Sequence, residues 1–258
     1  MSNITDTENS IPKQDQQTHF GYQNVATSKK ETLVRGVFDS VASQYDLMND
    51  LMSGGIHRLW KKVFVERLNP QPDMALLDLG GGTGDIAFRF LESGGENVVV
   101  CDINKEMLSV GRDRALDRGI LDDPRWICGN AESLPFDDSL MDAYTAAFCL
   151  RNVTDLPAAL AEAKRVLRPG GRFLCLEFSQ ISLPMFDKLY DLYSFNILPL
   201  LGQVVANDRD AYQYLAESIR RFPPQKDFAG MIADAGLDNV SYQNVSGGIA
   251  AIHSAWRI

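Results

Sequence analysis

Apolar positions along the chain follow two different periods, and together these periods predict a sheet of strands joined by helices. Short apolar runs, typical of buried strands, lie near residues 74–79, 97–102, 125–128, 141–148 and 172–177. Between them, apolar residues recur at helical spacing near residues 86–91, 105–118 and 155–166. Strands that alternate with helices form a mostly parallel, doubly wound α/β sheet.

The C-terminal part of the chain predicts an antiparallel edge for this sheet. Two helices are expected at residues 212–222 and 228–235, the second ending at Gly236. Two apolar runs follow, at 240–245 and 249–256, joined by Ser246-Gly247-Gly248. A short glycine-containing connection between strands predicts a hairpin. The expected sheet therefore has seven strands and closes with a C-terminal antiparallel hairpin.

The domain organisation follows from where these patterns begin. Residues 1–25 are polar and have the composition of a disordered tail. Residues 26–258 are expected to form a single domain, with an N-terminal helical cap at 26–68. The segment 183–222 carries more apolar residues than a helix that merely covers a sheet requires. It is expected to form a helical insertion over the substrate site; plain core, a subunit interface and a membrane-facing patch are the alternatives.

A glycine loop directly after the first strand is the strongest chemical signal. Asp78 ends the strand, and Gly80, Gly82 and Gly84 follow before the next helix. Glycine tolerates positive φ and lets backbone approach a ligand, and open α/β sheets bind ligands at the carboxyl ends of their strands. The dinucleotide fingerprint fails because its sixth loop position is Asp85, and the nucleotide-phosphate loop fails because no Gly-Lys-Ser/Thr follows.

An acidic residue, Asp102, ends the second strand, where a carboxylate can accept hydrogen bonds from both hydroxyls of a ribose. The loop and Asp102 together resemble the S-adenosylmethionine site of Rossmann-like class I methyltransferases. The resemblance implies that S-adenosylmethionine is the cofactor. The cofactor contacts that it implies are Gly80, Gly82, Thr83, Asp102 and the pair Asn130 and Ala131, which would lie against the adenine.

Composition narrows the function further. The net charge of −9 argues against a nucleic-acid partner and against a purely electrostatic hold on anionic lipid. The four cysteines form no close pair and there are only three histidines, so reduced thiols are expected and a metal site is not. No signal peptide and no apolar stretch long enough to span a bilayer is visible. We expect a cytoplasmic protein, with peripheral contact at the inner face of the membrane left open.

Two longer motifs resemble those of one methyltransferase family. Residues 45–60 keep the pattern Tyr-Asp-x-Met-Asn-x-x-Met-Ser-x-x-x-His-x-x-Trp, and residues 165–179 keep Arg-Val-Leu-Arg-Pro-Gly-Gly-Arg-Phe-x-x-Leu-Glu-x-Ser. Both are similar to the diagnostic motifs of the ubiquinone/menaquinone biosynthesis C-methyltransferases, as are Leu-Arg-Asn-Val at 150–153 and the helix that begins near Tyr214. One position departs from the family, because Ala147 replaces a serine that members often carry.

The resemblance implies methylation of a ring carbon in a polyprenylated benzoquinol, in demethylmenaquinol, or in both. A sulfonium methyl is already electrophilic, so the protein must align it, remove a phenolic proton and stabilise the resulting charge. Arg151 is the candidate cation, Asn152 the group that orients the hydroxyl, and Glu177 a further candidate base. Residues of the first motif, Tyr45, Asp46 and His57, would fold over the substrate, with His57 or Asp46 as proton acceptor.

Two other functions compete with this one. The same fold could methylate another small molecule, such as a phenol or a sterol. A non-catalytic scaffold of a quinone-synthesis complex is the second alternative. For either function, association with such a complex or as a homodimer is left open. The intact glycine loop, together with Asp102, Arg151 and His57, favours the quinol methyltransferase.

Overall fold

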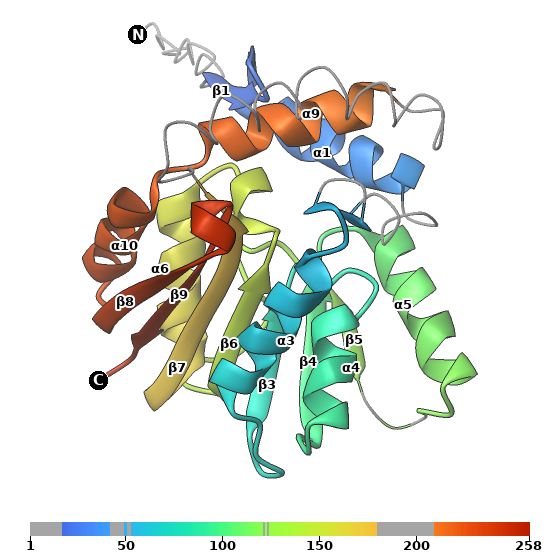
Figure 1. The fold of residues 1–258 in the computed structure, drawn as a ribbon, viewed down its shortest axis with the longest axis vertical. Helices are drawn as coiled ribbons and strands as arrows, with labels where there is room; N and C mark the ends of the chain where they lie inside the picture. The colour runs from blue at the N-terminus through green and yellow to red at the C-terminus, as the bar shows by residue number, and fades with distance from the viewer. Residues whose placement is uncertain (1–16, 42–48, 51–52, 121, 123, 180–208) are drawn as a thin grey trace, which may run out of the picture.

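A seven-stranded sheet forms the centre of the computed structural model, which describes residues 17–41, 49–50, 53–120, 122, 124–179 and 209–258 (Figure 1). The strand order is β5-β4-β3-β6-β7-β9-β8. The first five pair in parallel, whereas β9 is antiparallel to both β7 and β8. The bounds are β3 (Ala75–Leu79), β4 (Asn97–Asp102), β5 (Arg125–Cys128), β6 (Met141–Ala147), β7 (Leu167–Phe178), β8 (Asp238–Val245) and β9 (Ala250–Trp256).

The predicted sheet is therefore confirmed, including its C-terminal hairpin, whose strands are joined by η4 (Ser246–Gly248). Its central strands are apolar on both faces because helices cover both sides. Leu76 and Val98 belong to the core on one face, and Leu77 and Val99 to the core on the other, as the alternation of side chains along a strand requires. One strand is longer than expected, since β7 begins five residues before the predicted Arg172.

The helices that cover the sheet form two layers (Figure 1). One face carries α3 (His57–Leu68), α4 (Asp85–Glu92) and α5 (Lys105–Asp117), and the other carries α6 (Leu156–Val166) and α10 (Gln225–Asp234). Local signals set their starts: the Asn104 and Asp155 side chains accept hydrogen bonds from the Met107 and Ala158 backbone N–H groups and so cap α5 and α6. Two further helices, α1 (Thr27–Val41) and α9 (Arg209–Arg221), lie across one end of the sheet.

The N-terminal segment differs from the prediction. Residues 17–26 form an antiparallel hairpin of β1 (Gln17–Phe20) and β2 (Gln23–Ala26), so the expectation of disorder through residue 25 is wrong for residues 17–25. The hairpin rests on α9, where Glu217 Oε2 accepts a hydrogen bond of 2.9 Å from the Tyr22 backbone N–H. Tertiary contact with a helix nearly 200 residues away stabilises a segment that its own composition would leave unfolded.

The expected cap and insertion are described only in part. Helices α1 and α3 lie within the predicted cap at 26–68, and α9 lies within the predicted insertion at 183–222. Most of that insertion falls on residues 180–208, outside the described residues. Within the described part of the chain, no helix combines the length and the apolar character needed to cross a membrane.

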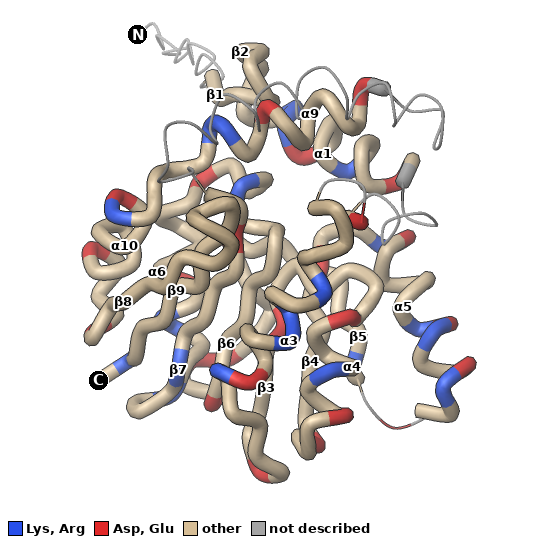
Figure 2. Tube along the Cα trace, viewed as in Figure 1, with Lys and Arg blue, Asp and Glu red and all other residues tan. Residues whose placement is uncertain are grey.

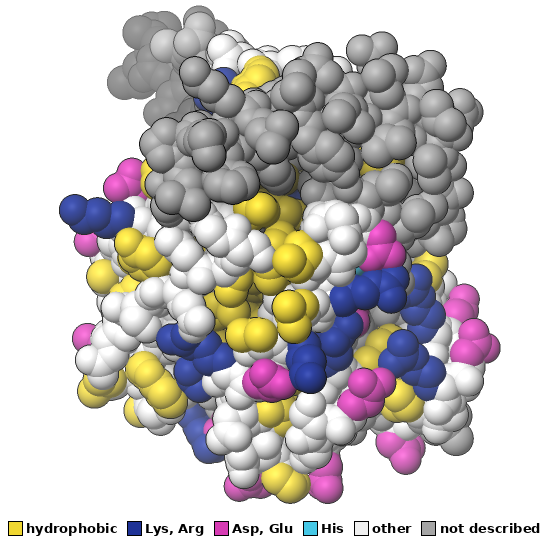
Figure 3. Space-filling model, in the orientation of Figure 1, with side chains coloured by type: hydrophobic (Ala, Val, Ile, Leu, Met, Phe, Trp, Pro, Cys, Tyr) yellow, Lys and Arg dark blue, Asp and Glu magenta, His cyan; other side chains and the backbone are white. Residues whose placement is uncertain are grey.

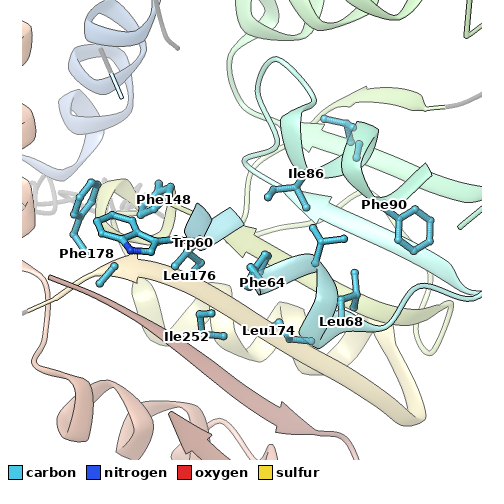
Figure 4. Packing of buried hydrophobic residues seen from close by; sticks show 14 of the residues in the cluster. Trp60, Phe64, Leu68, Ile86, Phe90, Phe148, Leu174, Leu176, Phe178 and Ile252 are labelled. Carbon is cyan, nitrogen blue, oxygen red and sulfur yellow. The ribbon is translucent and has the colours of Figure 1, made fainter. Parts of the chain in front are cut away.

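Helix α3 is fixed to the sheet by a row of buried side chains (Figure 4). Trp60, Phe64 and Leu68 recur at helical spacing and are almost completely buried. The Trp60 ring meets the edge of Phe178 with centroids 6.0 Å apart, and its Nε1–H donates to Ser246 Oγ at 2.8 Å. The first family motif therefore packs against the end of β7 and against the turn between β8 and β9.

An ion pair between a buried lysine and a half-buried aspartate joins α3 to α4. Lys61 Nζ lies 2.7 Å from Asp85 Oδ2, and Arg89 Nε lies 2.8 Å from Asp85 Oδ1. Burial opposes ionisation of Asp85, but Lys61 and Arg89 outweigh it and lower the pKa of this carboxyl to about 2. A carboxyl whose pKa is depressed on folding stabilises the protein above its unfolded pKa, and the stabilisation is lost as pH falls through the folded pKa.

We therefore expect Asp85→Asn to lower the free energy of unfolding by about 2 kcal/mol at pH 7, the value that corresponds to the depressed pKa. The difference from the wild type should shrink to about half by pH 3. Denaturant unfolding between pH 7 and pH 3 measures it, with Glu92→Gln at the exposed end of α4 as the control. A difference that stays constant across this range would contradict the assignment.

Candidate active site

The glycine loop between β3 and α4 has backbone angles that few other residues adopt. Gly80 and Gly82 have φ of 58° and 51°, and a Cβ built on Gly80 would lie 2.3 Å from the Cβ of Cys149. The Gly80 N–H donates to the Cys101 carbonyl at 2.7 Å, which ties the loop to β4. Any larger residue at Gly80 would push apart the ends of β3 and β6, so the loop depends on glycine for two separate reasons.

The carboxylate of Asp102 holds the loop from the neighbouring strand. Its Oδ2 accepts the Gly82 N–H at 3.0 Å, and its Oδ1 accepts the Asn104 N–H at 2.8 Å. Desolvation by the surrounding protein outweighs these hydrogen bonds and raises the pKa of Asp102 to about 6. Each oxygen keeps a lone pair beyond its backbone donor, so both can accept a further hydrogen bond from a ligand.

A second carboxyl group, Asp78, supports the loop from below. Its Oδ1 accepts the Thr145 hydroxyl at 2.8 Å, and its Oδ2 would lie 2.5 Å from a Cβ at Gly81. Among the described residues no hydrogen-bond donor contacts Oδ2, and burial raises the pKa of Asp78 to about 7. Two carboxyl groups at strand ends therefore support the loop: Asp78 packs under Gly81, and Asp102 accepts a hydrogen bond from Gly82.

A cavity of about 220 Å³ lies above these groups, between the strand ends and α1. Four of the predicted cofactor contacts line it: Gly80, Asp102, Asn130 and Ala131. Gly82 and Thr83 do not line it. Gly82 serves as the donor to Asp102, and the buried Thr83 hydroxyl accepts a hydrogen bond from Arg114 at 3.1 Å. A cofactor role for Thr83 stays a prediction.

Helix α1 forms the wall of the cavity opposite the sheet, and sequence reasoning did not assign it there. Val34, Arg35 and Phe38 line the cavity from this helix. Asn104 holds it in place, since its Nδ2 donates to Asp39 Oδ1 at 2.8 Å while its Oδ1 caps α5. The predicted helical cap at 26–68 includes this helix, but the sequence pattern does not indicate the surface on which the helix packs.

Arg151, the candidate active-site cation, does not line this cavity. It lies in η2 (Leu150–Asn152), and its Nη1 is 3.0 Å from Glu177 Oε2; both side chains are 1% exposed. Burial raises the pKa of Glu177, and Arg151 opposes that rise. Arg151 instead lines a second cavity of about 370 Å³, together with His19 and Arg221.

Breaking the buried ion pair between Arg151 and Glu177 destabilises the folded protein. Removing one partner leaves the other as an uncompensated buried charge, which costs about 3–5 kcal/mol. A variant of Arg151 that loses activity would therefore report on folding as well as on chemistry.

Of the predicted catalytic residues that the structure describes, Asn152 lines the cavity beneath α1. Its Oδ1 accepts the Tyr214 hydroxyl at 3.0 Å. Phe148, which precedes it at the end of β6, also lines the cavity and has φ of 60°, an angle that costs free energy for a non-glycine residue. The end of β6 therefore combines a strained backbone with an amide at the cavity wall.

His57 stands at the start of α3, outside the cofactor cavity. Its Nε2 lies 2.9 Å from Asp50 Oδ1, and Arg58 contacts both oxygens of the same carboxylate, at 3.0 and 2.6 Å. Burial, together with repulsion from Lys61, lowers the pKa of His57 despite Asp50. Asp50 was missed by sequence reasoning, although its place in the first motif could have indicated it. Tyr45 and Asp46 lie outside the described residues.

The family model described as the ubiE/COQ5 methyltransferase family matches residues 26–257. The chain belongs to this family. The predicted methyltransferase activity is confirmed, and with it the prediction of S-adenosylmethionine as the cofactor.

Individual relatives cover almost the whole of this methyltransferase. The Paracoccus denitrificans protein named "Ubiquinone/menaquinone biosynthesis C-methyltransferase UbiE" is 55% identical, with 96% of this chain and 99% of the relative aligned. The human protein named "2-methoxy-6-polyprenyl-1,4-benzoquinol methylase, mitochondrial" is 49% identical, over 95% of this chain and 86% of the relative.

Solved structures confirm the predicted class I fold of this family member. A Thermotoga maritima S-adenosylmethionine-dependent methyltransferase superposes with a TM-score of 0.62 at 16% identity, covering 87% of this chain and 100% of the other. A Streptomyces coelicolor geranyl diphosphate C-methyltransferase gives 0.58 at 16% identity, covering 80% and 82%.

Asp102→Ala is expected to weaken S-adenosylmethionine binding by about 10- to 100-fold, because charge-assisted hydrogen bonds contribute roughly 1.5–3 kcal/mol. Since the ionised carboxylate is the better acceptor and its pKa is about 6, wild-type affinity should rise as pH increases from 5 to 7. Calorimetric titration across this range measures both effects.

The matched control is Asp117→Ala, which removes an exposed carboxylate from α5. It should leave affinity and pH dependence unchanged. If Asp102→Ala bound the cofactor as tightly as the wild type, the assignment of the ribose to this carboxylate would be wrong.

Proposed function

We propose that this protein transfers the methyl group of S-adenosylmethionine to a ring carbon of a polyprenylated quinol, a benzoquinol, demethylmenaquinol or both. The observation that carries the proposal is the near-complete match to relatives whose names specify this chemistry. Bacterial relatives are named for ubiquinone and menaquinone biosynthesis, and the plant and human relatives for a benzoquinol methylase.

The order of the strands supports a direction for the bound cofactor. Asp102 ends β4 and Asn130 follows β5, so the adenosine would lie over these two strands. Because β3 and then β6 come next in the sheet, the sulfonium end would extend across the glycine loop toward β6. Asn152 stands at that end of the cavity. The acceptor ring would therefore meet the methyl group near η2.

The chemistry of transfer is simple once both molecules are aligned. The ring carbon forms a bond to the methyl carbon as the bond from methyl to sulfur breaks, and the electron pair returns to sulfur to give S-adenosylhomocysteine. The proton on the methylated ring carbon then passes through water to the ring oxygen, which restores the aromatic quinol, so the one proton released overall is the phenolic proton. Alignment can contribute several kcal/mol to the rate, and loss of the phenolic proton makes the ring carbon more nucleophilic.

His57 is our proposed acceptor for the phenolic proton. Its lowered pKa favours the neutral imidazole, and Asp50, held by Arg58, favours the tautomer with the proton on Nε2. Nδ1 is then the basic nitrogen, and it has no hydrogen-bond partner among the described residues. Tyr45 and Asp46 are proposed from the family motif to complete this side of the substrate site.

Arg151 is proposed to act through the turn that carries Asn152 rather than as a cation beside the substrate. Its Nη1 donates to the Phe148 carbonyl and to Glu177, so it ties the turn after β6 to β7. This arrangement supports a fixed position for Asn152, which is the residue of the pair that lines the cavity.

The proposal is tested by incubating the pure protein with labelled S-adenosylmethionine and short-tailed demethylated benzoquinol and naphthoquinol. We expect the label on a ring carbon, and cells that lack the protein should accumulate the demethyl precursor in quinone profiles. Label on an oxygen, or on a phenol or sterol but neither quinol, would favour another small-molecule methyltransferase. Cofactor binding without any product would favour a scaffold.

Peripheral contact with an anionic bilayer is a second part of the proposal, because a polyprenyl tail partitions into lipid. The outer face of α3 supports it: Leu59 is 57% exposed, and the neighbouring Arg58 and Lys62 side chains are also exposed. Basic residues recur along α3 in Figure 2, and Figure 3 shows hydrophobic side chains gathered in the middle of this face with Lys and Arg beside them. Exposed apolar and basic groups on one helix are typical of interfacial binding.

Leu59→Glu should lower binding to vesicles of equal phosphatidylglycerol and phosphatidylcholine by about tenfold, since burying a leucine contributes about 1.5–3 kcal/mol. Sedimentation with the vesicles measures the bound fraction. Leu116→Glu on α5 is the control, because Leu116 is 56% exposed on a different helix. An equal loss in both variants would contradict a role for the α3 face, and an unchanged Leu59→Glu would do the same.

A further inference from the structure

Tyr214 connects the cofactor cavity to the N-terminal hairpin. Its hydroxyl donates to Asn152 Oδ1 at 3.0 Å, and its ring stacks on Phe20 of β1 with centroids 4.1 Å apart and planes 15° from parallel. Tyr214 is only 4% exposed, so packing fixes the ring and therefore the hydroxyl. The hairpin itself is held on α9 by the contact between Tyr22 and Glu217.

This contact decides which end of the Asn152 amide faces the cavity. An asparagine side chain offers one oxygen as acceptor and one NH₂ group as donor. Burial raises the pKa of Tyr214, so its hydroxyl stays protonated and donates to the oxygen. The NH₂ group is left for the cavity that Asn152 lines, and among the described residues no acceptor contacts it.

The position of Asn152 indicates what this donor meets. It lies beyond the end of β6, two strands away from Asp102 at the end of β4. In the proposed orientation of the cofactor, the adenosine lies over the ends of β4 and β5, and the reactive methyl group points toward η2. A hydrogen-bond donor here would face the oxygen of the acceptor ring, where negative charge develops as the ring carbon becomes nucleophilic.

We propose that Tyr214 is a positioning residue that fixes the Asn152 amide, so that Nδ2 donates to the quinol oxygen beside the carbon that is methylated. The inference rests on the proposed function and deepens it. It assigns to Asn152 one chemical task, hydrogen-bond donation to a phenolate oxygen. It also explains why the N-terminal hairpin packs against α9 at this place.

Tyr214→Phe tests the proposal because it keeps the ring, and with it the stacking on Phe20, and removes only the hydroxyl. We expect kcat/KM for the quinol to fall about fivefold, since one hydrogen bond contributes about 1 kcal/mol. The Kd for S-adenosylmethionine, measured by calorimetry, should stay unchanged. The matched control is Tyr144→Phe, another buried tyrosine stacked on a phenylalanine, whose hydroxyl has no partner among the described residues. It should leave kcat/KM unchanged.

The double variant Tyr214→Phe with Asn152→Ala separates positioning from a general structural role. If Tyr214 acts through Asn152, the double variant should match Asn152→Ala alone in kcat/KM, because nothing is left to position. Effects that multiply would overturn the proposal, as would an equal loss in cofactor affinity or in Tyr144→Phe. A wild-type protein that binds the cofactor yet methylates no quinol would overturn the proposed function, and this inference with it.

Discussion

The bond between the Gly82 N–H and the Asp102 carboxylate is the contact on which the site depends. It joins the glycine loop of one strand to the acidic end of the next, so the two groups that we propose to contact the cofactor cannot shift independently. The same carboxylate accepts the Asn104 N–H, and the Asn104 side chain in turn caps α5 and contacts Asp39 of α1. One short run of hydrogen bonds therefore connects Asp102 to α5, which covers the sheet, and to α1, which covers the cavity.

The N-terminal elements complete a site that the sheet alone leaves open. Helix α1 covers the cofactor cavity, α3 packs its motif residues onto the end of β7, and the hairpin supports Tyr214 on α9. Helix α1 contacts Asn104 after β4, and α3 contacts Phe178 at the end of β7. The family motif that contains His57 and Trp60 is accordingly both a packing element and a candidate part of the catalytic machinery.

The centre of the sheet could be predicted because β3, β4, β6 and β7 are largely buried and so carry apolar runs. The glycine loop could be predicted because its glycines and Asp102 adjoin those runs. The N-terminal hairpin of β1 and β2 could not be predicted, because its polar residues are ordered by contacts with Glu217 and Tyr214 on the remote helix α9. The environment of Arg151 could not be predicted either. It depends on the parallel register that pairs Ala147 with Leu176 and so brings Glu177 beside the turn after β6.

The central claim is that S-adenosylmethionine lies across the glycine loop from Asp102 toward Asn152. A crystal structure with S-adenosylhomocysteine tests it most directly. Both ribose hydroxyls should lie within hydrogen-bond distance of the Asp102 carboxylate, with the sulfur over the end of β3 or β6 and facing η2. An adenosine bound over β6, or a ligand bound outside the cavity beneath α1, would contradict the account.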